Sequence, residues 1–276
     1  YPRHGAGHGD ADLHLRDGAG GSCDRQRYYS GLGGDHMILN MTGPATGGSA
    51  ISAPIIGEDF NWTGGDGTYQ VIEGKPWKIK FLSSGNFTPL KNMNIDGFLV
   101  GGGGGGGRAY CGSGGAGYTT TGKSIVLMAN TIYPIVIGGG GTTATSNSSS
   151  TSDGGNTTAF SLLAEGGKRS PTGDVKEKKP GGAGGSGGGG LFGTSGKAAG
   201  GTDGGDGTTA NTAGGKGQGT TTREFGEADG DLYASGGGDN LTMSIPNSGN
   251  GGYYFNGTIA AADGIVIIRQ HREETI

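Results

Sequence analysis

Large apolar side chains are scarce in this sequence. Leu, Ile, Val and Phe together number 44 of the 276 residues, roughly 16%, which is below the ~20% at which disorder becomes a serious alternative. Disorder normally also needs a high net charge, whereas the formal net charge here is only −4. No run of about 18 apolar residues is present, so the sequence predicts no transmembrane helix and no membrane insertion.

Clustered positive charge is missing as well. The 20 Lys and Arg residues are scattered, apart from a short run at Lys176, Lys178 and Lys179, so no nucleic-acid-binding face is indicated. The two cysteines, Cys23 and Cys111, are too few to identify a redox compartment, and they could pair or stay free. Nine prolines with irregular spacing exclude a collagen triple helix.

Glycine is what the sequence has in excess, with 69 residues against a usual share of about 7%. Residues 101–107 are all glycine, and further glycine tracts continue to Gly252. Ordering glycine costs more conformational entropy than ordering any other residue. A folded protein with these tracts therefore needs a stabilising term that does not depend on side chains.

Composition divides the chain into three parts. We predict a polar attachment or linker segment at residues 1–36, a β-strand connector region at 37–100, and a glycine-rich domain at 101–276 that a C-terminal strand closes. The first part contains His4, His8, His14 and His36 among several aspartates, but their spacing matches no zinc pattern. We expect neither a metal nor a cofactor.

Short apolar segments predict strands. Trp77, Ile79 and Phe81 alternate with lysines and share one face of a strand, and residues 83–85 suit a turn that leads into a return strand at 86–90. No segment combines a 3.6-residue period with helix caps, so we predict an all-β protein. The further segments expected as strands are residues 51–56, 69–72, 94–100, 124–128, 133–137 and 264–269.

Polyglycine suggests either a mobile linker or a packed bundle, and we favour the bundle. Extended polyproline-II-like segments with three residues per turn can approach closely when they lack side chains. Their N–H groups then donate to neighbouring carbonyls, with weaker Cα–H···O contacts in addition. Asn, Asp, Ser and Thr between the tracts suit the turns, and a rigid scaffold that carries loops is a recognition design.

Five blocks in this order resemble the glycine-rich domain of bacteriophage tail proteins, of the type found in phages and prophages of gut Gram-positive bacteria. The resemblance covers about residues 75–270. It implies packed polyglycine-II helices, loops that bind a bacterial cell-surface receptor (protein or glycan), contacts with other virion tail proteins, and an extracellular location in the virion tail. It leaves a homotrimer and a single copy open. The blocks are Trp77 to Gly85, Gly97 to Gly107, Tyr133 to Gly141, Gly217 to Gly226 and Gly264 to Arg269.

Catalytic motifs are weak. Residues 117–124 match the phosphate-loop spacing, but glycine precedes them and an expected strand, not a helix, follows. No Gly-x-Ser-x-Gly lies on a strand-to-helix turn, and Asp153, Asp203 and Asp206 do not complete a calcium ligand set. We expect no enzymatic activity. The alternative to receptor binding is a purely structural virion-decorating or extracellular fibre protein.

Exposed aromatic side chains in glycine-rich surroundings are the recognition candidates, because rigid rings supply contact area at low entropy cost. The expected tip loops are residues 146–153, 168–179 and 239–250. The candidate receptor-binding residues are Tyr110, Tyr118, Asn147, Asp153, Lys168, Arg169, Lys176, Phe192, Tyr233, Asn240, Tyr253 and Tyr254.

Overall fold

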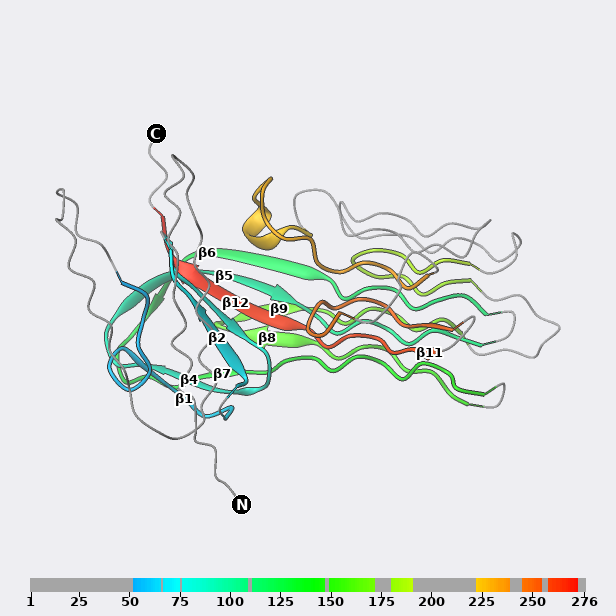
Figure 1. Cartoon of the computed structure of the whole chain (residues 1–276), viewed down its shortest axis with the longest axis horizontal. Coiled ribbons are helices and arrows are strands. Elements are labelled where there is room, and N and C mark those ends of the chain that lie inside the picture. The colour runs from blue at the N-terminus through cyan, green and yellow to red at the C-terminus, as the bar shows by residue number, and fades with distance from the viewer. Residues whose placement is uncertain are drawn as a thin grey trace, which may run out of the picture.

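A computed structural model describes most of the chain from residue 52 onward. The described residues are 52–65, 67–74, 76–108, 111–146, 149–171, 180–190, 222–238, 245–254 and 258–272. Within them the protein is all-β, as expected, with one short 3₁₀ helix, η1 (Glu224–Gly226), and no α-helix. Most of the strands gather at one end of an elongated molecule, and glycine-rich segments run side by side toward the other end (Figure 1).

A five-stranded antiparallel sheet forms the centre of the strand-rich end. β12 lies in its middle, although it comes last in the sequence: Ile267 pairs with Lys80 on one side and with Phe98 on the other. The expected strands 69–72, 94–100 and 264–269 are confirmed, whereas the expected strand at 51–56 is wrong, because the described residues 52–56 contribute only a bridge from Ile56 to Phe60. In spatial order the sheet contains β2 (Tyr69–Ile72), β3 (Lys78–Phe81), β12 (Ile265–Gln270), β5 (Met93–Val100) and β6 (Thr119–Leu127).

A second sheet, of three strands, packs against the first. It contains β1 (Phe60–Trp62), β4 (Gly85–Pro89) and β7 (Tyr133–Ile135). The expected hairpin of residues 77–81 with 86–90 is wrong, because β3 and β4 belong to different sheets. Residues 82–84 carry the chain between the sheets, so that Phe81 and Phe87 meet across the core, with ring centroids 5.5 Å apart.

The core between the two sheets is aromatic and aliphatic. Phe60, Phe81, Phe87 and Ile79 are fully buried there. A hairpin of β8 (Thr157–Ala159) and β9 (Leu162–Ala164) adds Phe160 to this core. A smaller hairpin, β10 (Tyr253–Tyr254) and β11 (Thr258–Ile259), lies in the glycine-rich end.

The glycine-rich end, which we call the glycine bundle, is held by backbone hydrogen bonds that repeat every three residues. Along residues 112–118, successive N–H groups point to three different neighbours and return to the first after three residues. Ser113 donates to the Gly189 carbonyl and Ala116 to that of Ser186. Gly114 donates to Gly252 and Gly117 to Gly249. Gly115 donates to Lys168 and Tyr118 to Glu165.

The carbonyl groups of residues 112–118 follow the same period toward three further neighbours. The first neighbour is the segment 101–107, whose residues 107, 104 and 101 donate to Gly112, Gly115 and Tyr118. The second neighbour donates from residues 182 and 185 to Ser113 and Ala116. The third donates from residue 237 to Gly114. Six chain segments therefore surround this one. Residues 101–107 are bonded in the same way, and Gly103 donates to Ala262, which is far away in the sequence.

Close approach of the backbones explains the glycines. A Cβ atom on Gly103 would lie 1.9 Å from the Asn250 carbonyl oxygen, and one on Gly105 would lie 1.8 Å from that of Thr142. None of residues 101–107 has φ in the left-handed region. These glycines are therefore required for space and not for an unusual backbone conformation.

Side chains complete the bundle where no backbone acceptor is in reach. Thr157 Oγ1 accepts from the Gly138 N–H at 3.0 Å, Asp263 Oδ1 from the Gly140 N–H at 2.7 Å, and Asn250 Oδ1 from the Ser235 N–H at 2.9 Å. The Gly138 N–H is buried, and a buried N–H without an acceptor is costly. These polar residues bond the scaffold, so their presence in the tracts does not by itself indicate a binding surface.

Candidate functional site

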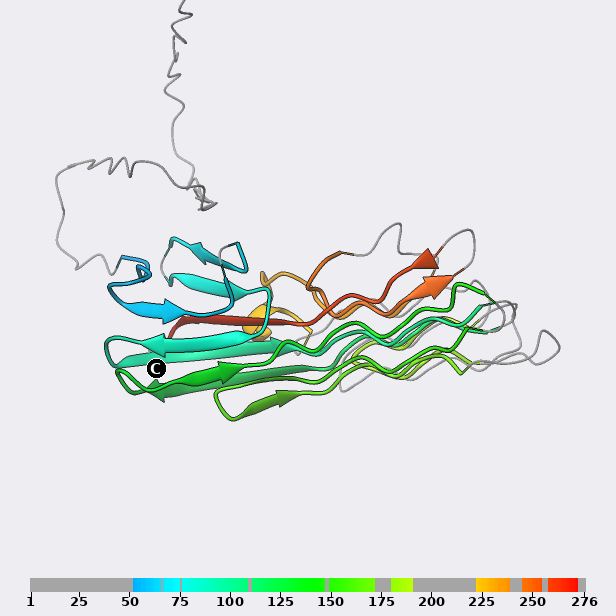
Figure 2. The ribbon, with the colours of Figure 1, turned by 90° about the horizontal axis from the view of Figure 1, so that it is seen from below.

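The chain turns at the far end of the bundle, remote from the two sheets (Figures 1 and 2). In the turn between residues 145 and 149, Ser149 Oγ accepts from the backbone N–H groups of Thr145 and Ser146 at 2.8 and 2.9 Å. Arg108 Nη1 donates to the Thr145 carbonyl at 2.6 Å. The described residues at the start of the expected loop 146–153, Ser146 and Ser149, are therefore joined by hydrogen bonds.

Three of the predicted site residues come together on the side of the bundle, and we call Asp153, Lys168 and Arg169 the side-face cluster. Lys168 Nζ lies 3.3 Å from Asp153 Oδ2, and the Arg169 backbone N–H donates to Asp153 Oδ1 at 2.9 Å. Arg169 Nη1 donates to the Thr151 carbonyl at 2.8 Å. All three residues are exposed, so their polar atoms are accessible to a ligand.

The electrostatics of this cluster favour an ionised Asp153. Partial burial by itself raises the pKa of Asp153, but the hydrogen bond from the Arg169 N–H and the ammonium of Lys168 together bring the pKa below its ordinary value. The carboxylate is thus negative at neutral pH and lies beside two basic side chains. The cluster presents both signs of charge within one small area.

Exposure on this face repeats every three residues, in step with the hydrogen bonds. Neighbouring exposed positions along one segment are roughly 9–10 Å apart. The exposed positions are Gly139, Thr142 and Thr145 on one segment, Ser150, Asp153 and Asn156 on the next, and Glu165, Lys168 and Pro171 on the third. The side-face cluster is thus part of a regular array of mostly polar groups.

Two predicted aromatic sites are not exposed. Tyr233 retains 9% of its surface and Tyr253 retains 7%. The ring of Tyr233 packs on Phe98 at 5.5 Å between centroids, and its hydroxyl accepts from Lys80 at 3.2 Å. The expectation of an exposed ring at these positions is wrong, because the bundle and the sheet use their few aromatic residues for packing.

The expected tip loop at residues 239–250 is also corrected in its described part. Asn247 Nδ2 donates to the carbonyls of Leu82 and Gly264 at 3.0 and 2.9 Å. Both acceptors adjoin the sheets, so the turn at residues 246–249 lies at the strand-rich end. Tyr118 is half-buried at the entrance to β6 and Tyr254 is in β10. Tyr110, Asn147, Lys176, Phe192 and Asn240 lie outside the described residues.

A buried charge cluster behind the five-stranded sheet escaped sequence reasoning. Glu224 of η1 is 1% exposed and lies 2.5 Å from Lys78 Nζ and 3.5 Å from Lys80 Nζ. Burial opposes the charge on Lys80, but Tyr233, Glu224 and Asp231 outweigh it and raise its pKa. In the sequence, Lys78 and Lys80 alternate with the buried residues Ile79 and Phe81 of β3. This alternation was the available signal that the lysine face of the strand packs against other residues as well.

A second buried pair joins β5 to β12. Arg269 Nε donates to Asp96 Oδ2 at 3.1 Å, and the Arg269 guanidinium lies 4.2 Å from the centroid of the Phe225 ring. His271 Nδ1 is 2.6 Å from Asp96 Oδ1. The Ser124 backbone N–H also donates to Asp96, while its hydroxyl is hydrogen-bonded to Asn94. These contacts therefore hold the strands together and do not form a serine triad.

Other chemistry has little support in the described part of the chain. The phosphate-loop match at residues 117–124 runs into β6, as predicted, so no helix N-terminus follows it. No group of three His, Cys, Asp or Glu side chains is placed to hold a metal ion in the described ranges. Nor do these ranges contain a helix of the length and apolarity that a membrane span requires.

A family model described as "Glycine-rich domain" matches residues 82–270. No curated protein matches the sequence.

Proposed function

This chain belongs to the glycine-rich domain family, and from that premise we propose that it is a bacteriophage tail-fibre or tail-tip protein that binds a bacterial surface receptor. The supporting observation is the three-residue hydrogen-bond pattern of the glycine bundle, whose segments run side by side away from the sheets. A scaffold held by backbone hydrogen bonds keeps its shape while the turns vary. The resemblance to phage tail proteins supplies the biological setting.

The bundle segments are, in this proposal, polyglycine-II helices. Support comes from six segments around residues 112–118, five of them bonded at three-residue intervals, because an extended helix with three residues per turn aims its donors in three directions. The missing space for Cβ atoms between the segments fits the same packing.

Recognition would use the far-end turns and the side-face cluster, with no catalytic step. The cluster's ion pair and the surrounding hydroxyl and amide groups suit polar surface groups of a glycan or a protein. The strand-rich end would then face other tail proteins, in an extracellular virion location. Both a single copy and a homotrimer are compatible with this arrangement.

Adsorption of virions to host cells tests the proposal. One set of virions carries Asp153→Ala, Lys168→Ala and Arg169→Ala, with alanine also at residues 145–150. The matched control carries Glu58→Ala, Glu73→Ala and Lys123→Ala, which are exposed on the strand-rich end. We expect adsorption to fall at least tenfold in the first set only. Full adsorption in both sets would instead favour the purely structural role.

A further inference from the structure

Two neighbouring segments of the glycine bundle, residues 149–156 and 165–171, carry the side-face cluster. Hydrogen bonds join residues whose numbers rise in one segment and fall in the other, so the two segments are antiparallel. These bonds run from the Gly154 N–H to the Gly167 carbonyl, from the Gly166 N–H to Asn156 Oδ1, and from the Arg169 N–H to Asp153 Oδ1.

The exposed positions that repeat every three residues pair off between these segments at three levels, and we call the six residues the paired strip. Successive levels are roughly 9–10 Å apart, because an extended segment turns once in three residues. The outer two levels are therefore roughly 18–20 Å apart. The levels are Ser150 with Pro171, Asp153 with Lys168, and Asn156 with Glu165.

Backbone donors are open along the paired strip. Within the segment 149–156, the N–H groups that point in two of the three directions donate to neighbouring segments of the bundle. The third direction belongs to Ser150, Asp153 and Asn156, whose N–H groups have no hydrogen-bond acceptor among the described residues. All three residues are exposed. A ligand whose oxygen atoms repeat at the same interval can therefore accept from this row.

The composition of the paired strip suits a polar ligand without net charge. Two acidic residues, Asp153 and Glu165, are balanced by Lys168 and the adjacent exposed Arg169, so a polyanion or a polycation meets like charges here. None of the six strip positions is aromatic or is Leu, Ile, Val or Met, although the centre of a protein–protein interface normally buries such side chains. Hydroxyl groups, in contrast, can donate to the carboxylates and accept from the ammonium group.

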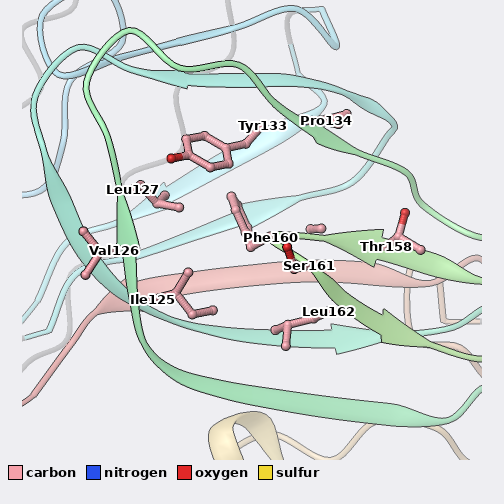
Figure 3. Close-up of a pocket in the computed structure, with 10 residues that line it drawn as sticks. Ile125, Val126, Leu127, Tyr133, Pro134, Thr158, Phe160, Ser161 and Leu162 are labelled. Atoms are coloured by element: carbon pink, nitrogen blue, oxygen red, sulfur yellow. The ribbon is translucent and has the colours of Figure 1, made fainter.

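The pocket at the strand-rich end is a different kind of surface. It has a volume of about 370 Å³ and lies between β6, β7 and the β8–β9 hairpin (Figure 3). Its lining contains Ile125, Leu127, Phe160 and Leu162, with a hydroxyl group from Ser161, and no charged side chain. A polar polymer therefore finds better partners on the paired strip, and Ser161 serves as a control position.

We propose that the paired strip binds a linear, uncharged glycan of the bacterial surface that lies along the bundle axis and contacts all three levels. The assignment rests on the receptor-binding function proposed above, and it narrows the receptor from a protein or glycan to a glycan. An extended polysaccharide repeats its hydroxyl oxygens at a fixed interval, as the strip repeats its donors. Once one level is bound, contacts at the next level are intramolecular, so affinity rises with chain length.

Calorimetric titration of the purified full chain tests the length dependence. The probe is polysaccharide released from the host cell wall by mild acid, freed of charged fractions and separated by length. We expect the Kd to fall at least tenfold as the probe grows from one level to three levels, and to stay constant for longer probes. Binding of the protein to whole host cells should survive protease treatment of the cells and disappear after periodate, which cleaves sugar diols.

Variants at the two ends of the strip test its geometry. Glu165→Gln and Ser150→Ala each remove a polar partner from an outer level, so each should raise the Kd of the long probes at least threefold. Probes that span one level should keep their Kd, because the other levels are intact. The matched controls Glu58→Gln and Ser161→Ala are at exposed positions of the strand-rich end and should leave every Kd unchanged.

Two results would overturn the glycan assignment, and neither depends on whether a variant folds. One is an equal Kd for short and long probes. The other is no affinity for any released polysaccharide, together with loss of cell binding after protease treatment. Failure of receptor binding itself has a different signature, which is full virion adsorption when the side-face cluster is replaced by alanine.

Discussion

The two ends of this molecule achieve order by different means. In the strand-rich end, side chains make the fold: Phe60, Phe81 and Phe87 are fully buried between two sheets. In the glycine bundle, the backbone makes the fold, and a side chain in the wrong place prevents it. Few large apolar residues are therefore enough for the described part of the chain, because they are concentrated at one end and the other end needs none.

The two ends are sensitive to opposite kinds of substitution. A missing side chain leaves a cavity in the sheet core, whereas an added methyl group in the bundle collides with a carbonyl. Removing a core side chain loses favourable contacts, whereas adding a methyl group in the bundle prevents several hydrogen bonds from forming.

The largest expected effect is a side chain inside the bundle. Gly103→Val should prevent the bundle from forming, since even its Cβ would lie 1.9 Å from the Asn250 carbonyl oxygen. We expect a loss above about 5 kcal/mol, seen as loss of amide exchange protection over residues 101–118. Gly139→Ala is the matched control, because its Cβ would meet only Asp263 Oδ1 at 3.8 Å. Equal stability of the two variants would contradict the close-packed bundle.

Removing a core ring comes next. Phe81→Ala should lower the free energy of unfolding by about 3–5 kcal/mol, from lost burial and a cavity. Chemical denaturation measures this, with the exposed Glu73→Ala as a control that changes little. Exchange protection of the bundle amides then shows whether the two ends unfold together. A loss below about 1 kcal/mol would mean that the sheet core is not a major source of stability.

A side-chain acceptor in the bundle should matter less. Thr157→Val keeps the shape but leaves the Gly138 N–H without its acceptor at 3.0 Å. An unsatisfied buried donor costs about 1–3 kcal/mol. The neighbouring Thr158 is half-buried, and Thr158→Val should change stability by less than about 0.5 kcal/mol. If Thr157→Val and Thr158→Val lost similar amounts of stability, the effect would come from the β8–β9 hairpin as a whole and not from the hydrogen bond to Gly138.

The smallest expected effect is a pH dependence in the sheet. Burial by itself raises the pKa of Asp96, but hydrogen bonds from His271, the Ser124 N–H and Arg269 together lower it. A carboxyl group with a lower pKa in the folded state stabilises the protein above about pH 4, and this contribution disappears as pH falls through the folded-state pKa. The free energy of unfolding should therefore decrease on acidification.

Asp96→Asn should flatten this dependence while lowering stability at neutral pH, because Arg269 loses its buried partner. Urea unfolding at several pH values between 7 and 3 measures both effects. Asp229→Asn, at an exposed position, should keep the wild-type pH dependence. If the free energy of unfolding of the Asp96→Asn protein depended on pH as in the wild type, the acid sensitivity would belong to other carboxylates.

Several elements were predictable because their signal is local. The alternation of Trp77, Ile79 and Phe81 identified the strand and its buried face, and the apolar run at residues 264–269 identified β12. The pairing of β12 between β3 and β5 was not predictable, because nothing local in the run selects its partners. The same limit produced the wrong hairpin of β3 with β4.

The candidate site was predictable only in part. Asp153, Lys168 and Arg169 were selected as separate loop residues, and the bundle brings them together on one side face. Tyr233 was selected for its glycine-rich neighbours in sequence, yet its neighbours in space are Phe98 and Lys80. The buried Glu224 had no local signal that distinguished it from a surface glutamate.

The sequence by itself determined that backbone contacts must replace side-chain contacts in the second half of the chain, since residues without Cβ atoms have little else to offer. Only the tertiary structure decided which glycines are indispensable. Gly103 touches a segment about 150 residues later, and Gly139 has open space beside it. A glycine tract carries no information about its partners, because every glycine presents the same donor, the same acceptor and no side chain.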